Sequence, residues 1–194
     1  MATINLLVEG EIDEIAAHKL VFEVGHQVGV CYGKKGYPYI KNKIRDFNKS
    51  AQKTYYLALV DFMDTGYSCP PQVVSTLLPH RNDLMFFRVV VREIESWIMA
   101  DRINIARFLN VSIEKIPLNP EDEVDPKQKL VNIARISRSS KIISALVPEQ
   151  NSTALVGKLY TSEIKRFIVD FWDINSARLN SPSLNKCLER LEEI

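Results

Sequence analysis

Apolar and amphipathic segments alternate along the first ninety residues. Four short runs have the apolar, β-branched and aromatic composition of strands, at residues 4–8, 28–32, 54–60 and 84–91. Helical patterns separate them, at residues 11–26, 40–53 and 71–78. Because the third run is apolar without a break, it is typical of a central strand covered on both faces. The pattern predicts an α/β fold with a mostly parallel, four-stranded, Rossmann-like sheet flanked by helices.

The second half of the chain shows helical spacing and no convincing strand. Apolar residues recur three and four positions apart at Ile164, Phe167, Ile168 and Phe171. Asp101, the pair Asp125-Pro126 and the pair Ser181-Pro182 resemble helix starts. We therefore expect a domain at residues 1–114 and a C-terminal helical extension at residues 115–194, packed on that domain.

Composition indicates an ordinary globular chain. Among 194 residues, 46% are hydrophobic, and 25 Lys and Arg balance 24 Asp and Glu to a net charge of +1. These values exclude disorder and fibrous repeats. No apolar stretch is long enough for a membrane span and no signal peptide is recognisable, so we expect a cytoplasmic protein without membrane partners. Three widely spaced Cys and three His without a ligand pattern favour neither disulfides nor zinc.

Acidic residues follow the predicted strands. Glu9 ends the first, Asp61 ends the third with Asp64 just beyond it, and Glu93 and Glu95 follow the fourth, while Asp13 lies four residues after Glu9. Ligands of open parallel sheets bind at the carboxyl ends of the strands. Carboxylates that converge there repel one another, and the usual resolution is a hard divalent cation such as Mg²⁺ or Mn²⁺.

Structural interpretations compete with this one. Acidic residues after strands often cap helices or face solvent, and Asp125 is a natural cap for the helix that carries Lys127. The segment Arg92 to Glu95 reads equally well as a surface salt-bridge turn. Residues 34–53 hold seven Lys and Arg against Asp46 alone, interleaved with aromatics. That stretch could bind a phosphate backbone through Lys34, Lys35, Lys41, Lys43 and Arg45, or form a solvated helix face.

Two sets of motifs resemble known families. Val8-Glu9-Gly10 with Asp13-Glu14, followed by an apolar strand that closes on Asp61, resembles the Toprim domain of topoisomerases, primases and overcoming-lysogenization-defect nucleases. REIESWIMAD at residues 92–101, then RFLNV, DPKQKL at residues 125–130 and SPSL, resemble the bacterial family called domain of unknown function 4276, itself regarded as Toprim-like. The first resemblance covers about residues 1–100, and the second covers nearly the whole chain.

The Toprim resemblance implies that Glu9 acts in acid or base chemistry and that Asp61 binds Mg²⁺. The chain departs from the usual Asp-x-Asp motif, since Met63 stands at the second aspartate and Asp64 follows one position later. Either a shifted loop lets Asp64 substitute, or metal binding is weakened. The candidate catalytic residues are Glu9, Asp13, Arg92 and Glu93. The candidate metal ligands are Glu9, Asp61, Asp64 and Glu95, and Lys127 is a further candidate cation for developing negative charge.

Three functions remain open from the sequence. The leading one is a Mg²⁺-dependent nuclease or related phosphoryl-transfer enzyme acting on nucleic acid, DNA in preference to RNA. The family resemblance implies a role in defence against phage or mobile DNA, beside an ATPase partner, and leaves a homo-oligomer open. The second is a non-catalytic Toprim-like module that binds nucleic acid or protein. The third is a small-molecule phosphohydrolase, because metal and carboxylates serve any phosphate ester.

Overall fold

A computed structural model describes residues 1–194, and the chain divides into two compact units. The first comprises residues 1–91 together with 183–194, and the second comprises residues 92–182. This division differs from the boundary expected at residues 114 and 115. The chain leaves the sheet directly after its last strand, and its final helix returns to the sheet because that helix has an apolar face.

The first unit contains one four-stranded sheet in the order β2-β1-β3-β4, with every pairing parallel. Its strands are β1 (Thr3–Val8), β2 (Gln27–Gly33), β3 (Tyr55–Asp61) and β4 (Met85–Val90). Each matches a predicted run to within two residues. The α/β class and the flanked parallel sheet are therefore confirmed.

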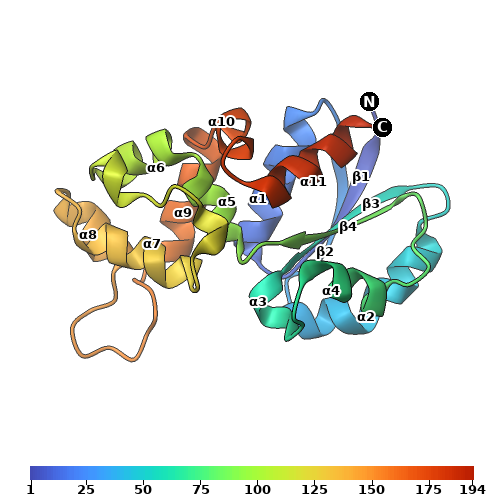
Figure 1. Ribbon diagram of the computed structural model, residues 1–194, viewed down its shortest axis with the longest axis horizontal. Helices are drawn as coiled ribbons and strands as arrows, with labels where there is room; N and C mark the ends of the chain where they lie inside the picture. Colours follow the sequence, from blue (N-terminus) through green and yellow to red (C-terminus); the bar gives the residue numbers. More distant parts are fainter. The chain divides into compact units, whose positions relative to one another are not determined.

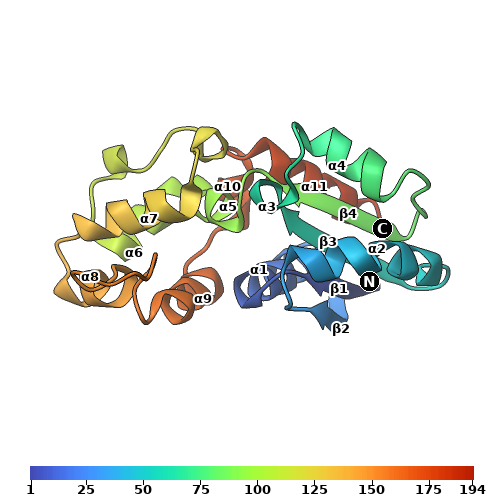
Figure 2. The same cartoon turned by 90° about the horizontal axis from the view of Figure 1, so that it is seen from below.

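Helices cover both faces of this sheet. They are α1 (Glu11–Glu23), α2 (Tyr37–Ser50), the short α3 (Phe62–Thr65), α4 (Pro70–Leu77) and α11 (Pro182–Glu192). Figure 1 shows α1 and α11 on one face and α2 with α4 on the other, and Figure 2 shows the second face from below. Helix α1 stops short of the expected residue 26 because Gly25, at φ 79°, turns the chain and donates its N–H to Phe22.

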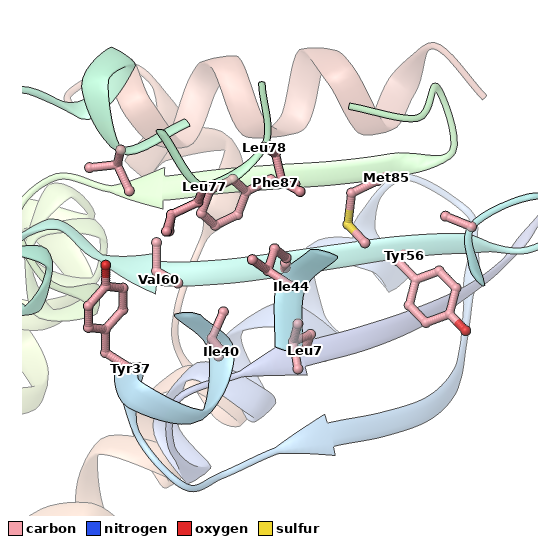
Figure 3. Packing of buried hydrophobic residues seen from close by; sticks show 13 residues of the cluster. Leu7, Tyr37, Ile40, Ile44, Tyr56, Val60, Leu77, Leu78, Met85 and Phe87 are labelled. Carbon is pink, nitrogen blue, oxygen red and sulfur yellow. The ribbon is translucent and has the colours of Figure 1, made fainter. Parts of the chain in front are cut away.

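The core beneath α2 and α4 is closely packed. Strand residues such as Leu7, Val60 and Phe87 form one cluster with Ile40 and Ile44 of α2 there, all at most 1% exposed (Figure 3). The two-residue alternation of side chains along a strand places the intervening strand residues against the opposite helices. The packed centre of the sheet holds β1 and β3 in place, and so sets the positions of the residues that directly follow these strands.

The opposite face is covered by α1 and by the returning α11. The buried His26 ties this arrangement together, since its Nδ1 accepts from the Ala2 N–H at 3.2 Å and its Nε2 lies 3.1 Å from the Leu191 carbonyl oxygen. With Nδ1 accepting, Nε2 carries the proton and donates to Leu191. The contact joins the N-terminal strand to the last helix.

The second unit is entirely helical. Its helices are α5 (Ile94–Ala100), α6 (Arg102–Leu109), α7 (Pro126–Arg135), α8 (Ser140–Leu146), α9 (Tyr160–Asp170) and α10 (Ile174–Arg178), with 3₁₀ turns at Ile113–Lys115 and Pro120–Asp122. Asp101 and Asp125 cap α6 and α7 as expected. The predicted stripe on α9 is buried except for Phe171, which is 46% exposed and packs against Phe108.

Two further expectations concern the chain as a whole. None of its helices has the length and apolar character that crossing a bilayer requires. Cys31, Cys69 and Cys187 are all free thiols, as their number and spacing predicted.

Candidate carboxylate site at the sheet edge

Glu9 and Asp61 meet at the carboxyl edge of the sheet. They follow or end the neighbouring strands β1 and β3, and the Glu9 Oε1 accepts a hydrogen bond from the Asp61 backbone N–H at 2.9 Å. Both residues are buried, at 9% and 8% exposure. The two residues are therefore adjacent, with the side chain of Glu9 bonded to the backbone of Asp61.

The backbone around Glu9 is held by the loop between β2 and α2. Lys34 donates its N–H to the Val8 carbonyl at 2.8 Å, and Gly36 donates to the Glu9 carbonyl at 3.0 Å. Gly33 makes this approach feasible, because its φ is 98° and a Cβ there would lie 2.2 Å from the Val8 oxygen. The glycines between β2 and α2 thus fix the position of Glu9.

Asp64 reaches the site from the short helix that follows β3. Its carboxyl group shares a hydrogen bond with that of Glu9, while Met63 is 40% exposed. The acidic residue on α3 therefore stands one position later in the sequence than the second aspartate of the Asp-x-Asp motif. Whether Asp64 substitutes for the second aspartate of the Asp-x-Asp motif stays a prediction.

Asp13 lies on the same edge and has a structural role of its own. Its Oδ2 accepts the Gly10 N–H at 2.8 Å, which closes the first turn of α1. The same charge lies close enough to Glu9 to raise the pKa of that residue. Asp13 thus orients α1 and contributes negative potential to the site.

The local environment favours the neutral form of Glu9. Burial raises its pKa from 4.5 to about 8, and the charges of Asp64 and Asp13 act in the same direction against the Asp61 hydrogen bond. A carboxyl group with this pKa holds its proton at neutral pH and releases it just above. Such a group can donate or accept a proton in a reaction near pH 7.

Tyr37 places a hydroxyl group near the same edge. This first residue of α2 is 7% exposed, and its Oη is buried without a hydrogen-bond partner. Its ring lies beside the end of β3, close to Val60 (Figure 3). Burial raises the pKa of Tyr37, and Tyr67 and Glu9 raise it further. A buried donor without a partner is uncommon in folded proteins, so the Tyr37 hydroxyl is an unsatisfied polar group near this edge.

The donor set suits a hard divalent cation in kind. Carboxylate oxygens are the ligands that Mg²⁺ and Mn²⁺ prefer, and a cation would offset the burial and the neighbouring negative charges that now keep a proton on Glu9. Glu9, Asp61 and Asp64 would hold it. In the structure itself, no three His, Cys, Asp or Glu side chains are already arranged around one point in the manner of a metal site.

The predicted residues Glu93, Glu95 and Lys127 form a separate cluster inside the second unit. Lys127 Nζ lies 3.2 Å from Glu93 and 3.7 Å from Glu95, and the Lys127 N–H donates to Glu93 at 3.1 Å. Tyr160 donates its hydroxyl to Glu95 at 3.0 Å. The cluster joins α5, α7 and α9, which gives these residues a clear packing role.

Glu95 is fully buried, so the segment is no surface salt-bridge turn. Burial raises its pKa to about 7 against the attraction of Lys127, and its Oε2 has no hydrogen-bond partner. Arg92 precedes the cluster, is partly exposed, and donates its N–H to Ser96 at 3.2 Å. The assignment of Arg92, Glu93 and Glu95 to catalysis or metal binding remains a prediction.

The basic segment is largely exposed, but several of its charges are already engaged. Lys34 pairs with Glu14 and Lys43 with Asp46. Arg45 donates to the carbonyl oxygens of Leu77 and Thr76, at 3.2 and 3.3 Å, and so ties α2 to the end of α4. That bonding gives Arg45 a role in the fold. Lys35 and Lys41 lie over the rings of Tyr39 and Tyr37 and face solvent.

Sequence reasoning counted Tyr37 only among the aromatics of the basic segment, and it missed Tyr160. Tyr37 directly follows Gly36 and starts a helix, a position at which only its aromatic character among solvated neighbours hinted at burial. Tyr160 lies 65 residues from its partner Glu95, a separation that carries no local pattern.

Comparison of the chain with protein-family models, with curated proteins and with solved structures found no match. The resemblance of its motifs to the Toprim and 4276 families therefore remains a prediction.

Proposed function

We propose that this chain is a divalent-metal-dependent phosphoryl-transfer enzyme that cleaves nucleic acid, DNA in preference to RNA. The observation that supports the proposal most is that Glu9 accepts the Asp61 N–H at the carboxyl edge of a parallel sheet, with the Asp64 carboxyl group beside that of Glu9. Open α/β sheets bind their ligands at this edge. The motifs around Glu9 and Asp61 that resemble Toprim nucleases point to the same chemistry.

Phosphodiester cleavage requires neutralisation of the phosphoryl oxygens, which Mg²⁺ or Mn²⁺ supplies when bound. Asp61 and Asp64 provide oxygen ligands from the end of β3 and from α3. Asp13 holds the first turn of α1 in place through the Gly10 N–H. These side chains position the site and contribute its negative charge.

Glu9 is the residue for proton transfer. Its carboxyl group is fixed by the Asp61 N–H and, without metal, has a pKa of about 8; a bound cation would lower that pKa and favour the ionised form. Once ionised, the same group can accept a proton from an attacking water. The exposed cations Lys35 and Lys41 on α2, the helix that starts at Tyr37, are candidates for contacts with the phosphate backbone.

The test is cleavage of plasmid DNA by the full chain with Mg²⁺ or Mn²⁺. We expect cleavage by the unaltered protein, and a loss of at least about 100-fold in Glu9→Gln and Asp61→Asn. Glu149→Gln is the matched control, because Glu149 is an exposed acid whose only role is an ion pair with Lys158. Cleavage by both site variants at the unaltered rate would refute the proposal.

A second function is favoured by one observation. The structure has no group of three His, Cys, Asp or Glu side chains around a common point, and a non-catalytic module needs no such group. Such a module would bind nucleic acid or a protein through the same fold without holding metal. Calorimetric titration with Mg²⁺ separates the two: the enzyme binds the ion through Glu9 and Asp61, and the module gives no saturable heat.

The wider role follows only from the family resemblance. It suggests cytoplasmic defence against phage or mobile DNA beside an ATPase partner. Co-purification of an ATPase with the tagged chain from its native host tests that association directly.

A further inference from the structure

A cavity of about 380 Å³ lies within the second unit, at the segment that joins α6 to α7. Its walls come from the start of α6, from the 3₁₀ turn Ile113–Lys115 with the residues after it, and from α7. The volume lies within the range of small-molecule sites, about 300–1,000 Å³. None of its lining residues belongs to the carboxylate site of the sheet.

Arg102 is the most firmly placed of the cavity's charges. One nitrogen of its guanidinium group donates to the carbonyl oxygens of Ile113 and Ile116, at 3.4 and 3.2 Å. These bonds fix the plane of the group against the turn. Its Nε is buried and closed to a ligand, so the other terminal nitrogen is the donor that these bonds leave available. A fixed guanidinium with donors to spare is well suited to an oxyanion.

Two lysines add to the charge of the same cavity. Lys115 makes no ion pair, and Lys129 pairs with Glu123 at 3.0 Å from outside the lining. Glu114 is the single acid that lines the cavity, against three cations. The cavity therefore favours an anion over a neutral or cationic ligand.

The remaining wall is apolar. Pro117 and Leu118 line the cavity, and Leu118 is 70% exposed. A ligand with a ring or sugar beside its anionic group would cover this side chain. The cavity thus combines three cationic side chains with an apolar surface at Pro117 and Leu118, and an inorganic anion would not cover that surface.

We propose that this cavity binds a phosphomonoester that carries an organic group, as a mononucleotide does. The phosphate contacts Arg102, Lys115 and Lys129, and the organic group lies on Pro117 and Leu118. The proposal is independent of the nuclease proposal, because it uses neither the acidic residues at the sheet edge nor a metal.

Titration of the full chain with AMP, inorganic phosphate and adenosine, in EDTA and followed by calorimetry, tests the site. We expect AMP to bind with a dissociation constant on the order of 0.1–1 mM, phosphate to bind more weakly and adenosine not to bind. Phosphate that binds as tightly as AMP would overturn the assignment of an organic group to Pro117 and Leu118. EDTA removes divalent metal ions, so that metal-dependent binding at other sites does not contribute to the measured heat.

Variants then locate the binding. Lys115→Gln and Lys129→Gln should each weaken AMP about fivefold, and Leu118→Ser should weaken AMP without affecting phosphate. Lys158→Gln, an exposed lysine away from this cavity, is the control and should bind as the unaltered chain does. The proposal is overturned if AMP gives no saturable heat up to about 10 mM, if adenosine binds as AMP does, or if both lysine variants bind AMP unchanged.

Discussion

Replacing Glu9 with glutamine should stabilise the metal-free protein near neutral pH. Glutamine copies the neutral carboxyl group: its oxygen can accept the Asp61 N–H at the observed 2.9 Å, and its amide can donate to Asp64. The native glutamate must instead keep a proton that it would lose in the unfolded chain. The difference between the two is a direct measure of the electrostatic field at the sheet edge.

The magnitude follows from the pKa of Glu9, 4.5 ordinarily and about 8 in the fold. Below about pH 4.5 both states are protonated and the fold carries no penalty. As pH rises towards 8, the unfolded chain ionises while the fold holds its proton, so stability falls. Each pKa unit corresponds to about 1.4 kcal/mol, which at about pH 7 gives a penalty of at most about 3 kcal/mol. We expect Glu9→Gln to raise the free energy of unfolding near pH 7 by about 1–3 kcal/mol.

The assay is urea unfolding in EDTA between about pH 5 and 8, followed by far-UV circular dichroism. Tryptophan fluorescence does not serve here, because Trp97 and Trp172 both belong to the second unit. Glu149→Gln, a change in an exposed ion pair, is the control for a lost acidic charge. Equal pH dependence in the unaltered chain and in Glu9→Gln would refute the reasoning about the site.

Other consequences can be measured in the same preparations. Tyr37→Phe removes a buried hydroxyl group without a hydrogen-bond partner, so thermal unfolding should show stability that is unchanged or higher by up to about 1 kcal/mol. A loss of stability above about 2 kcal/mol would show that the hydroxyl group does form a hydrogen bond. Because burial raises the pKa of Glu95 to about 7, stability falls as pH rises from about 4.5 to 7; Glu95→Gln should flatten that slope in tryptophan fluorescence, and a slope that persists would place its origin elsewhere. The double change of Lys35 and Lys41 to Gln should weaken DNA binding and lower the number of ions released on binding by about two. An unchanged DNA affinity would show that these two lysines do not contact DNA.

The sheet could be predicted from sequence because its information is local. An uninterrupted apolar run such as residues 54–60 must be covered on both faces, and the helical patterns between the strands supply the cover. Caps such as Asp101 and Asp125 need only three residues of context, and both were found.

The division of the chain could not be predicted in this way. Helix α11 has an amphipathic pattern like those of its predecessors, and nothing local tells whether its apolar face meets other helices or the sheet. Its place is decided by long-range contacts, such as that of His26 with Leu191 across 165 positions. The boundary expected after residue 114 followed the polar loop, whereas the structure divides where the sheet ends.

The site was predictable in part for the same reason. Glu9 and Asp61 end strands that neighbour each other in a parallel sheet, so topology alone brings them together. Arg45 shows the limit, because a basic residue in a basic segment gave no sign that it bonds to two carbonyl oxygens of another helix. Charge patterns locate surfaces, but partner choice depends on tertiary packing.

Anomalous diffraction from crystals of the full chain soaked in Mn²⁺ tests the central claim most directly. We expect a peak at the carboxyl edge of the sheet, coordinated by Glu9, Asp61 and Asp64, that disappears in Asp61→Asn. A peak found only elsewhere, or none while these three side chains keep their present hydrogen bonds, would contradict it.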